Sequence, residues 1–156
     1  MKHIPNNIIA LIGIGNEGRR DDGLGWAFVD AVTQAGFGGD ALYRYQLQVE
    51  DAELISGYQA VIFADATSES LSDGWHYAEL ASAGHMEWTT HRMSPEAVLS
   101  VCETLYGKRP RTWLLAIEGR QWGLQTGLSP EASAHLKGAL KVWPHVQAEV
   151  LKSLPA

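Results

Sequence analysis

The chain has 156 residues, of which 46% are hydrophobic and 19% are charged, and this composition predicts one globular domain, residues 1–156, with a core of ordinary size. A formal charge of -6 at pH 7 gives no positive field for nucleic acid or for an anionic membrane surface, so neither is expected as a partner. The single cysteine, Cys102, excludes an internal disulfide. It lies in a helical stripe, Val98, Leu99, Cys102 and Leu105, that is typical of a core.

The start of the chain loosely imitates a signal peptide. Met1-Lys2-His3 precedes an apolar run, Ile8 to Ile12, but that run meets Gly13, Gly15 and then acidic residues, so we interpret it as a buried first strand. No apolar stretch approaches the roughly 20 residues needed to span a bilayer. We therefore expect a soluble, cytoplasmic protein.

In chain order, the first half predicts strands separated by one clear helix. Ile8 to Ile12 and Ala60 to Ala64 are apolar almost throughout, which is typical of strands buried on both faces. Between them, apolar residues from Leu24 to Val32 recur with helical period. The segment Leu42 to Val49 alternates apolar and polar residues and predicts a further strand.

The second half continues the alternation. Trp75 to Leu80 follows a Ser-Asp-Gly turn and is predicted to be an edge strand, and Trp113 to Ile117 is another buried strand. Ser94-Pro95-Glu96 and Ser129-Pro130-Glu131 each predict a helix start, because a hydroxyl cap, a first-turn proline and an acid suit the positive helix end. Pro144 is expected to kink or end the last helix. The alternation predicts βαβ units and a mainly parallel sheet covered on both faces.

Ligands of open α/β sheets bind beyond the carboxyl ends of the strands, and the sequence places acidic residues there. A glycine-rich turn, residues 13–25, follows the first strand and carries Asp21 and Asp22 to the start of a helix. Asp65 directly follows the apolar run Ala60 to Ala64. The sequence therefore directs attention to this edge of the sheet.

Gly13, Gly15 and Gly18 fit the dinucleotide fingerprint G-x-G-x-x-G, which lets a pyrophosphate approach a helix N-terminus. In this chain five further residues delay the helix, and two of them are carboxylates that would repel phosphate. The second predicted strand also lacks the acid that binds ribose. A nucleotide-binding module without hydrolytic activity remains the alternative function.

Asp22, Asp65 and His91 form a second candidate set. Each has an ordinary explanation, since the two acids can cap turns or a helix and His91 can be an exposed loop residue. Together, two carboxylates and an imidazole from three strand ends offer oxygen and nitrogen ligands to a divalent transition metal. A metal-capturing module without hydrolytic activity therefore also stays open. The other histidines are interpreted as surface residues: His3, His76, His85, His135 and His145.

Signatures of common hydrolases are missing from the sequence. It contains no H-E-x-x-H zinc motif, no G-x-S-x-G elbow and no P-loop. A standard metallohydrolase is therefore disfavoured.

Several segments resemble the hydrogenase maturation proteases in order and spacing, over about residues 8–140. The resemblance rests on the following motifs: Gly13-Ile14-Gly15-Asn16, Asp21-Asp22-Gly23-Leu24-Gly25, Gln46-Leu47, Val49-Glu50-Asp51-Ala52-Glu53-Leu54, Phe63-Ala64-Asp65-Ala66, Thr90-His91 and Gly127-Leu128-Ser129. Two positions depart from the family pattern, because Arg20 stands where a smaller residue, often glycine, is usual, and Val49 stands where proline is expected. Glu17 and Glu50 are acids near the same strand ends that we leave outside the proposed set.

The resemblance implies a three-layer α/β/α sandwich with a twisted, mainly parallel five-stranded sheet, whose edge strand we expect to be antiparallel. It also implies an endopeptidase that removes a C-terminal extension from the nickel-loaded large-subunit precursor of a nickel-iron hydrogenase. The residues that bind the metal in the family map onto Asp22, Asp65 and His91. The nickel is supplied by the precursor, and no catalytic zinc of the enzyme's own is expected. Which hydrogenase is served and how many subunits assemble stay open.

Overall fold

The computed structural model describes residues 8–81 and 93–155. Five strands form one sheet: β1 (Ile9–Ile14), β2 (Asp40–Arg44), β3 (Ala60–Thr67), β4 (Trp75–Leu80) and β5 (Arg111–Glu118). The helical elements are η1 (Glu17–Gly23), α1 (Leu24–Gln34), α2 (Glu50–Ile55), α3 (Pro95–Tyr106) and α4 (Pro130–Ser153). Within the described ranges, no helix is long and apolar enough to cross a membrane.

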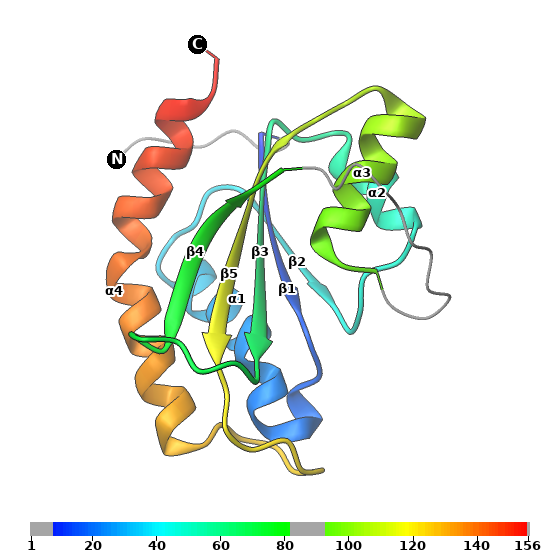
Figure 1. The fold of residues 1–156 in the computed structure, drawn as a ribbon. Helices are drawn as coiled ribbons and strands as arrows, with labels where there is room; N and C mark the ends of the chain where they lie inside the picture. The colour runs from blue at the N-terminus through cyan, green and yellow to red at the C-terminus, as the bar shows by residue number, and fades with distance from the viewer. Residues whose placement is uncertain (1–7, 82–92, 156) are drawn as a thin grey trace.

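The sheet has the strand order β2-β1-β3-β5-β4. The first four of these strands are parallel neighbours, and β4 pairs antiparallel with β5 at one edge. Helices α1 and α4 lie on one face of the sheet and α2 and α3 on the other (Figure 1). The predicted α/β/α sandwich with an antiparallel edge strand is confirmed.

Each face of the sheet carries its own core. Leu11 and Phe28 are buried with Trp143 of α4 on one face, where the rings of Phe28 and Trp143 meet edge to face at 5.5 Å. On the other face, Phe63 packs in one cluster with Leu99 of α3. Burying a large apolar side chain stabilises the fold by roughly 1.5–3 kcal/mol. The central strand β1 and residues 60–64 of β3 are apolar throughout because both faces of the sheet are covered.

Both predicted helix starts have the expected caps. The Ser94 hydroxyl accepts a hydrogen bond from the Ala97 amide, and the Ser129 hydroxyl accepts one from the Ala132 amide, each at 3.1 Å. These bonds satisfy amides that a helix cannot pair within itself. The capping prediction is confirmed at both sites.

Three details differ from the sequence-based predictions. The predicted strand Leu42 to Val49 is observed as Asp40–Arg44, and the chain then turns into α2, which was not predicted. Leu105 is 63% exposed and lies outside the core, whereas Cys102 is buried as expected. Pro144 does not end α4, which runs on to Ser153, because Pro144 lies on the exposed side where water can bond the carbonyl that proline leaves free.

Candidate functional site

Two glycines bring β1, β3 and the start of α1 into close contact. A Cβ atom at Gly25 would lie 2.4 Å from the carbonyl oxygen of Ala64 and 2.5 Å from that of Ile14. A Cβ atom at Gly13 would lie 2.7 Å from the Gly25 carbonyl oxygen. Only glycine permits this approach. The first residues of α1 therefore lie against Ala64 of β3, which directly precedes Asp65.

Asp22 is held in place by the turn between β1 and α1. Its Oδ2 atom accepts a hydrogen bond of 2.9 Å from the Asn16 amide. Gly15 has a φ of +136°, and a Cβ atom there would lie 2.0 Å from the Asp22 carbonyl oxygen. The half-buried Asp22 carboxylate thus has a fixed position at the carboxyl end of β1.

Asp22 and Asp65 line the same cleft, which has a volume of about 350 Å³. The segment after β2 forms one wall with Leu47, and the segment leading into α3 forms another with Met93. These two walls are joined by an antiparallel bridge in which the Met93 amide donates to the Leu47 carbonyl oxygen at 3.4 Å. The two predicted carboxylates are therefore brought together at the expected edge of the sheet.

The third predicted ligand, His91, lies outside the described residues, as do His3 and His85. Met93, which follows His91 by two positions, lines the cleft. Among residues 8–81 and 93–155, no three His, Cys, Asp or Glu side chains are grouped closely enough to hold a metal ion. A complete set of three would therefore need a ligand from outside these ranges, and His91 is the predicted one.

Asp21, the neighbour of Asp22, has a different environment. It is fully buried, and its carboxylate accepts bonds from the backbone amides of Arg120, Gln121 and Ser129 and from the Ser129 hydroxyl, all between 2.7 and 2.9 Å. Burial alone would raise the pKa of Asp21, but these hydrogen bonds together lower it below the ordinary value. Asp21 is an ionised anchor that joins the turn carrying Asp22 to the loop before α4.

The glycine-rich turn offers few free amides to a phosphate. The Gly15 amide donates to the Arg44 carbonyl oxygen at 2.9 Å, and the Gly18 amide donates to Asn16 Oδ1 at 2.9 Å. The amides of Arg20 and Asp21 donate to carbonyl oxygens of the loop that precedes α4. A phosphate cradle needs such amides to point at the ligand. Because these amides are already bonded, the turn is poorly suited to bind a nucleotide phosphate. Close packing of the backbone explains why positions 13 and 15 are glycine.

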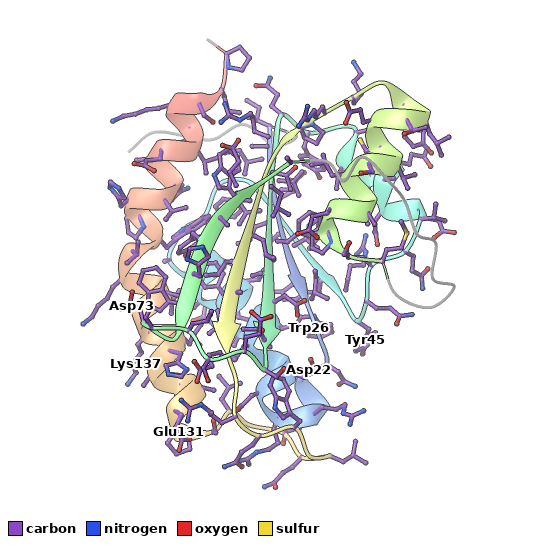
Figure 2. All side chains as sticks on the ribbon, in the orientation of Figure 1. Asp22, Trp26, Tyr45, Asp73, Glu131 and Lys137 are labelled. Carbon is purple, nitrogen blue, oxygen red and sulfur yellow. The ribbon has the colours of Figure 1, made fainter. Side chains whose placement is uncertain are left out.

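A second hollow of about 540 Å³, which the sequence did not predict, adjoins the cleft. Trp26, Tyr43 and Tyr45 line it together with Arg44, Gln46, Gln48, Glu50 and Asp51. Tyr45 and Gln46 line both spaces. Figure 2 shows Asp22, Trp26 and Tyr45 at the same end of the molecule, by the carboxyl ends of β1 and β2. The available signal was the run Tyr43-Arg44-Tyr45 at the end of a strand.

The remaining titratable residues of interest lie elsewhere. His76 and His145 are exposed as predicted, but His135 is half-buried, and its Nδ1 atom lies 2.7 Å from the Glu118 carbonyl oxygen. The Cys102 thiol donates to the Lys108 carbonyl oxygen, and burial raises its pKa. Neither environment suits a nucleophile.

No protein-family model matches the chain, and no curated protein matches its sequence. Solved structures do match its fold. The hydrogenase maturating endopeptidase HybD from E. coli is 21% identical, with a TM-score of 0.69 over 94% of this chain and 93% of that one. The [NiFe] hydrogenase maturation protease HycI from Thermococcus kodakarensis KOD1 is 21% identical, with a TM-score of 0.66 over 94% of each chain.

A hydrogenase 2 maturation peptidase from a Thaumarchaeota archaeon is 19% identical, with a TM-score of 0.65 over 90% of this chain and 97% of that one. The chain thus shares the fold of these proteins over nearly its whole length. At such identities the likeness establishes the fold, and function has to be argued from the site.

Proposed function

We propose that this chain is an endopeptidase that removes the C-terminal extension of the nickel-loaded large-subunit precursor of a nickel-iron hydrogenase, in the cytoplasm. The observation that carries the proposal is the shared cleft of Asp22 and Asp65 at the carboxyl end of the sheet, in a chain with the fold of hydrogenase maturation proteases. The substrate is a protein, and its nickel ion is part of that substrate.

In the proposed mechanism, Asp22, Asp65 and His91 recognise the nickel ion on the side that the precursor leaves open. Carboxylate oxygens and an imidazole nitrogen are suitable ligands for such an ion. Asp22 is already oriented by the Asn16 amide, so one of its oxygens has a fixed position before substrate arrives. The cleft would then hold the scissile peptide near these side chains, and proximity and orientation would contribute to the rate.

The chain's own residues also suggest how water is used. A carboxylate in the cleft is the type of group that takes a proton from an attacking water, provided that it lies within hydrogen-bond reach. Asp22 has one oxygen bonded to Asn16 and offers its other oxygen to the nickel ion, which would hold this carboxylate beside the scissile peptide. Asp21 is fully buried, with both oxygens bonded, and therefore takes no part. The proposed chemistry requires no resident zinc.

Intact-mass measurement tests the proposal most simply. The purified chain is incubated with nickel-loaded large-subunit precursors, and the mass of each precursor is followed with time. The proposal expects one cut and the release of one C-terminal peptide. A non-hydrolytic metal- or nucleotide-binding module would leave every precursor mass unchanged.

Two variants make the test specific. Asp22→Asn keeps the shape of the side chain but removes its charge, so it should slow cleavage at least 100-fold, a loss of about 3 kcal/mol in transition-state stabilisation. Asp73→Asn removes the charge of an exposed aspartate in the turn before β4 and serves as the matched control. Equal rates for both variants would contradict the assigned role of Asp22.

A further inference from the structure

We propose that the hollow beside the cleft binds a lysine or arginine side chain of the precursor polypeptide. This inference rests on the proposed function, because it assigns a binding site to the same substrate. The site consists of an aromatic shelf, defined as Trp26, Tyr43 and Tyr45, and the carboxylate of Glu50.

Hydrogen bonds and ring contacts hold the aromatic shelf together. The Trp26 indole N–H donates to the Arg44 carbonyl oxygen at 3.0 Å, and its ring lies 5.3 Å from that of Tyr43 and 5.2 Å from that of Tyr45. The Tyr43 hydroxyl donates to Asp30 of α1 at 2.5 Å. Burial, followed by the interaction with Asp30, raises the pKa of Tyr43 to about 12, so this hydroxyl stays protonated. Tyr45 is nevertheless 68% exposed.

The exposed Tyr45 ring lines the hollow, so a ligand in the hollow can contact it. Tyr45 packs against Trp26 at an interplanar angle of 33°, and the ring remains accessible to a ligand. The faces of Trp and Tyr rings are electrically negative and attract Lys and Arg side chains. The shelf thus prefers a cationic ligand.

The charged residues around the shelf also favour a cationic ligand. Arg44 is the basic residue that lines the hollow, and it is already engaged with Asp51 at 3.0 Å and with the Tyr43 carbonyl oxygen. Asp51 also accepts a bond from the Gln48 amide. Among the residues that the structure describes, none forms an ion pair with Glu50. One cation against two carboxylates leaves this wall net negative.

The position of the hollow explains how the precursor reaches it. Tyr45 and Gln46 are shared with the cleft that holds Asp22 and Asp65, so the two spaces adjoin at these side chains. A polypeptide bound in the cleft passes Tyr45 directly. A Lys or Arg in that polypeptide would place its alkyl stem on the ring and its charge toward Glu50.

Cleavage kinetics with the nickel-loaded precursor test whether the aromatic shelf binds this substrate. Tyr45→Ala should raise KM about 10-fold, and Glu50→Gln about 5-fold, with smaller changes in kcat, because both remove binding and not chemistry. Tyr106→Ala, which removes an exposed tyrosine of α3, is the matched control and should leave KM unchanged. An unchanged KM in Tyr45→Ala, while wild type cleaves normally, would overturn the shelf and leave the proposed function standing.

A binding experiment tests the aromatic shelf independently of cleavage. It therefore applies even if no precursor is cut, a result that would contradict the proposed function. The indole N–H resonance of Trp26, assigned with Trp26→Phe, is followed by NMR during titration with acetyl-Gly-Arg-Gly-amide or acetyl-Gly-Glu-Gly-amide to millimolar concentration. The proposal expects a saturable shift with the arginine peptide that is lost in Tyr45→Ala. No shift, an equal shift with the glutamate peptide, or an unaltered shift in Tyr45→Ala would each overturn it.

Discussion

The carboxylate of Asp21 accepts hydrogen bonds from both the backbone amide and the hydroxyl of Ser129, which lies 108 positions further along the chain. The same hydroxyl caps helix α4 through the Ala132 amide. One buried carboxylate therefore ties the turn that carries Asp22 to the start of the last helix.

This arrangement predicts the effect of Asp21→Asn. The amide nitrogen would face donors that now point at a carboxylate oxygen, so buried N–H or O–H groups would lose their acceptor, each at a cost of about 1–3 kcal/mol. We expect Asp21→Asn to lower the free energy of unfolding by about 3 kcal/mol in urea titration. Asp73→Asn, at an exposed site, should change it by less than about 0.5 kcal/mol. Equal losses would contradict the anchor role.

Asp21 also predicts a dependence of stability on pH. Because its folded pKa lies below the ordinary value of 3.8, its contribution is fully present above that value and is lost as the pH falls through the folded pKa. The free energy of unfolding should therefore drop below about pH 4. The drop should be smaller in Asp21→Asn, measured by urea titration from pH 2 to 7. Parallel curves for the two proteins would contradict the assignment.

A third prediction concerns Arg20, which has φ 54° and ψ −119°. A residue other than glycine in such a conformation costs about 1–3 kcal/mol. Arg20→Gly should therefore stabilise the protein by about 1 kcal/mol, even though it loses the exposed bond from Arg20 to Gln121. Arg20→Ala loses the same bond and keeps the strain, so it should not be stabilised. Thermal melting of the two variants separates the relief of backbone strain from the loss of the bond to Gln121.

The contact between α1 and the sheet predicts a fourth result. Helix propensity alone would make Gly25→Ala stabilising by about 1 kcal/mol. A Cβ atom 2.4 Å from the Ala64 carbonyl oxygen reverses the sign, because backbone on both sides has to move. We expect a net loss of about 2 kcal/mol and impaired cleavage. Gly123→Ala, where a Cβ atom meets nothing within 4 Å, is the control and should be neutral in both assays.

Much of the fold was predictable because its strands are buried on both faces. The apolar runs at 8–12, 60–64 and 113–117 each correspond to an observed strand of the sheet, and Trp75–Leu80 was predicted with its observed bounds. The serine caps identified two helix starts. Helix α2 was missed because its six residues give little periodic signal.

The candidate site was predicted only in part. Asp22 and Asp65 were placed at strand ends by the sequence, and they line one cleft. The resemblance assigned Asp22 and not Asp21 to the metal set, but the role of Asp21 as a buried anchor was not predictable, because it depends on donors from residues 120–129, about a hundred positions away. The aromatic shelf was missed for a similar reason, since Trp26 and Tyr45 meet only when α1 packs beside β2.

The central claim is that Asp22, Asp65 and His91 recognise nickel carried by the precursor, and cleavage itself measures it most directly. Wild type, Asp65→Ala, His91→Ala and the control His145→Ala, at an exposed histidine of α4, are each incubated with precursor that contains or lacks nickel. Thermal melting verifies that every variant is folded, and the products are read by intact mass. We predict that wild type and His145→Ala cut only the nickel-loaded precursor, whereas Asp65→Ala and His91→Ala cut neither. Efficient cutting of the nickel-free precursor by wild type, or full activity in His91→Ala, would contradict the claim.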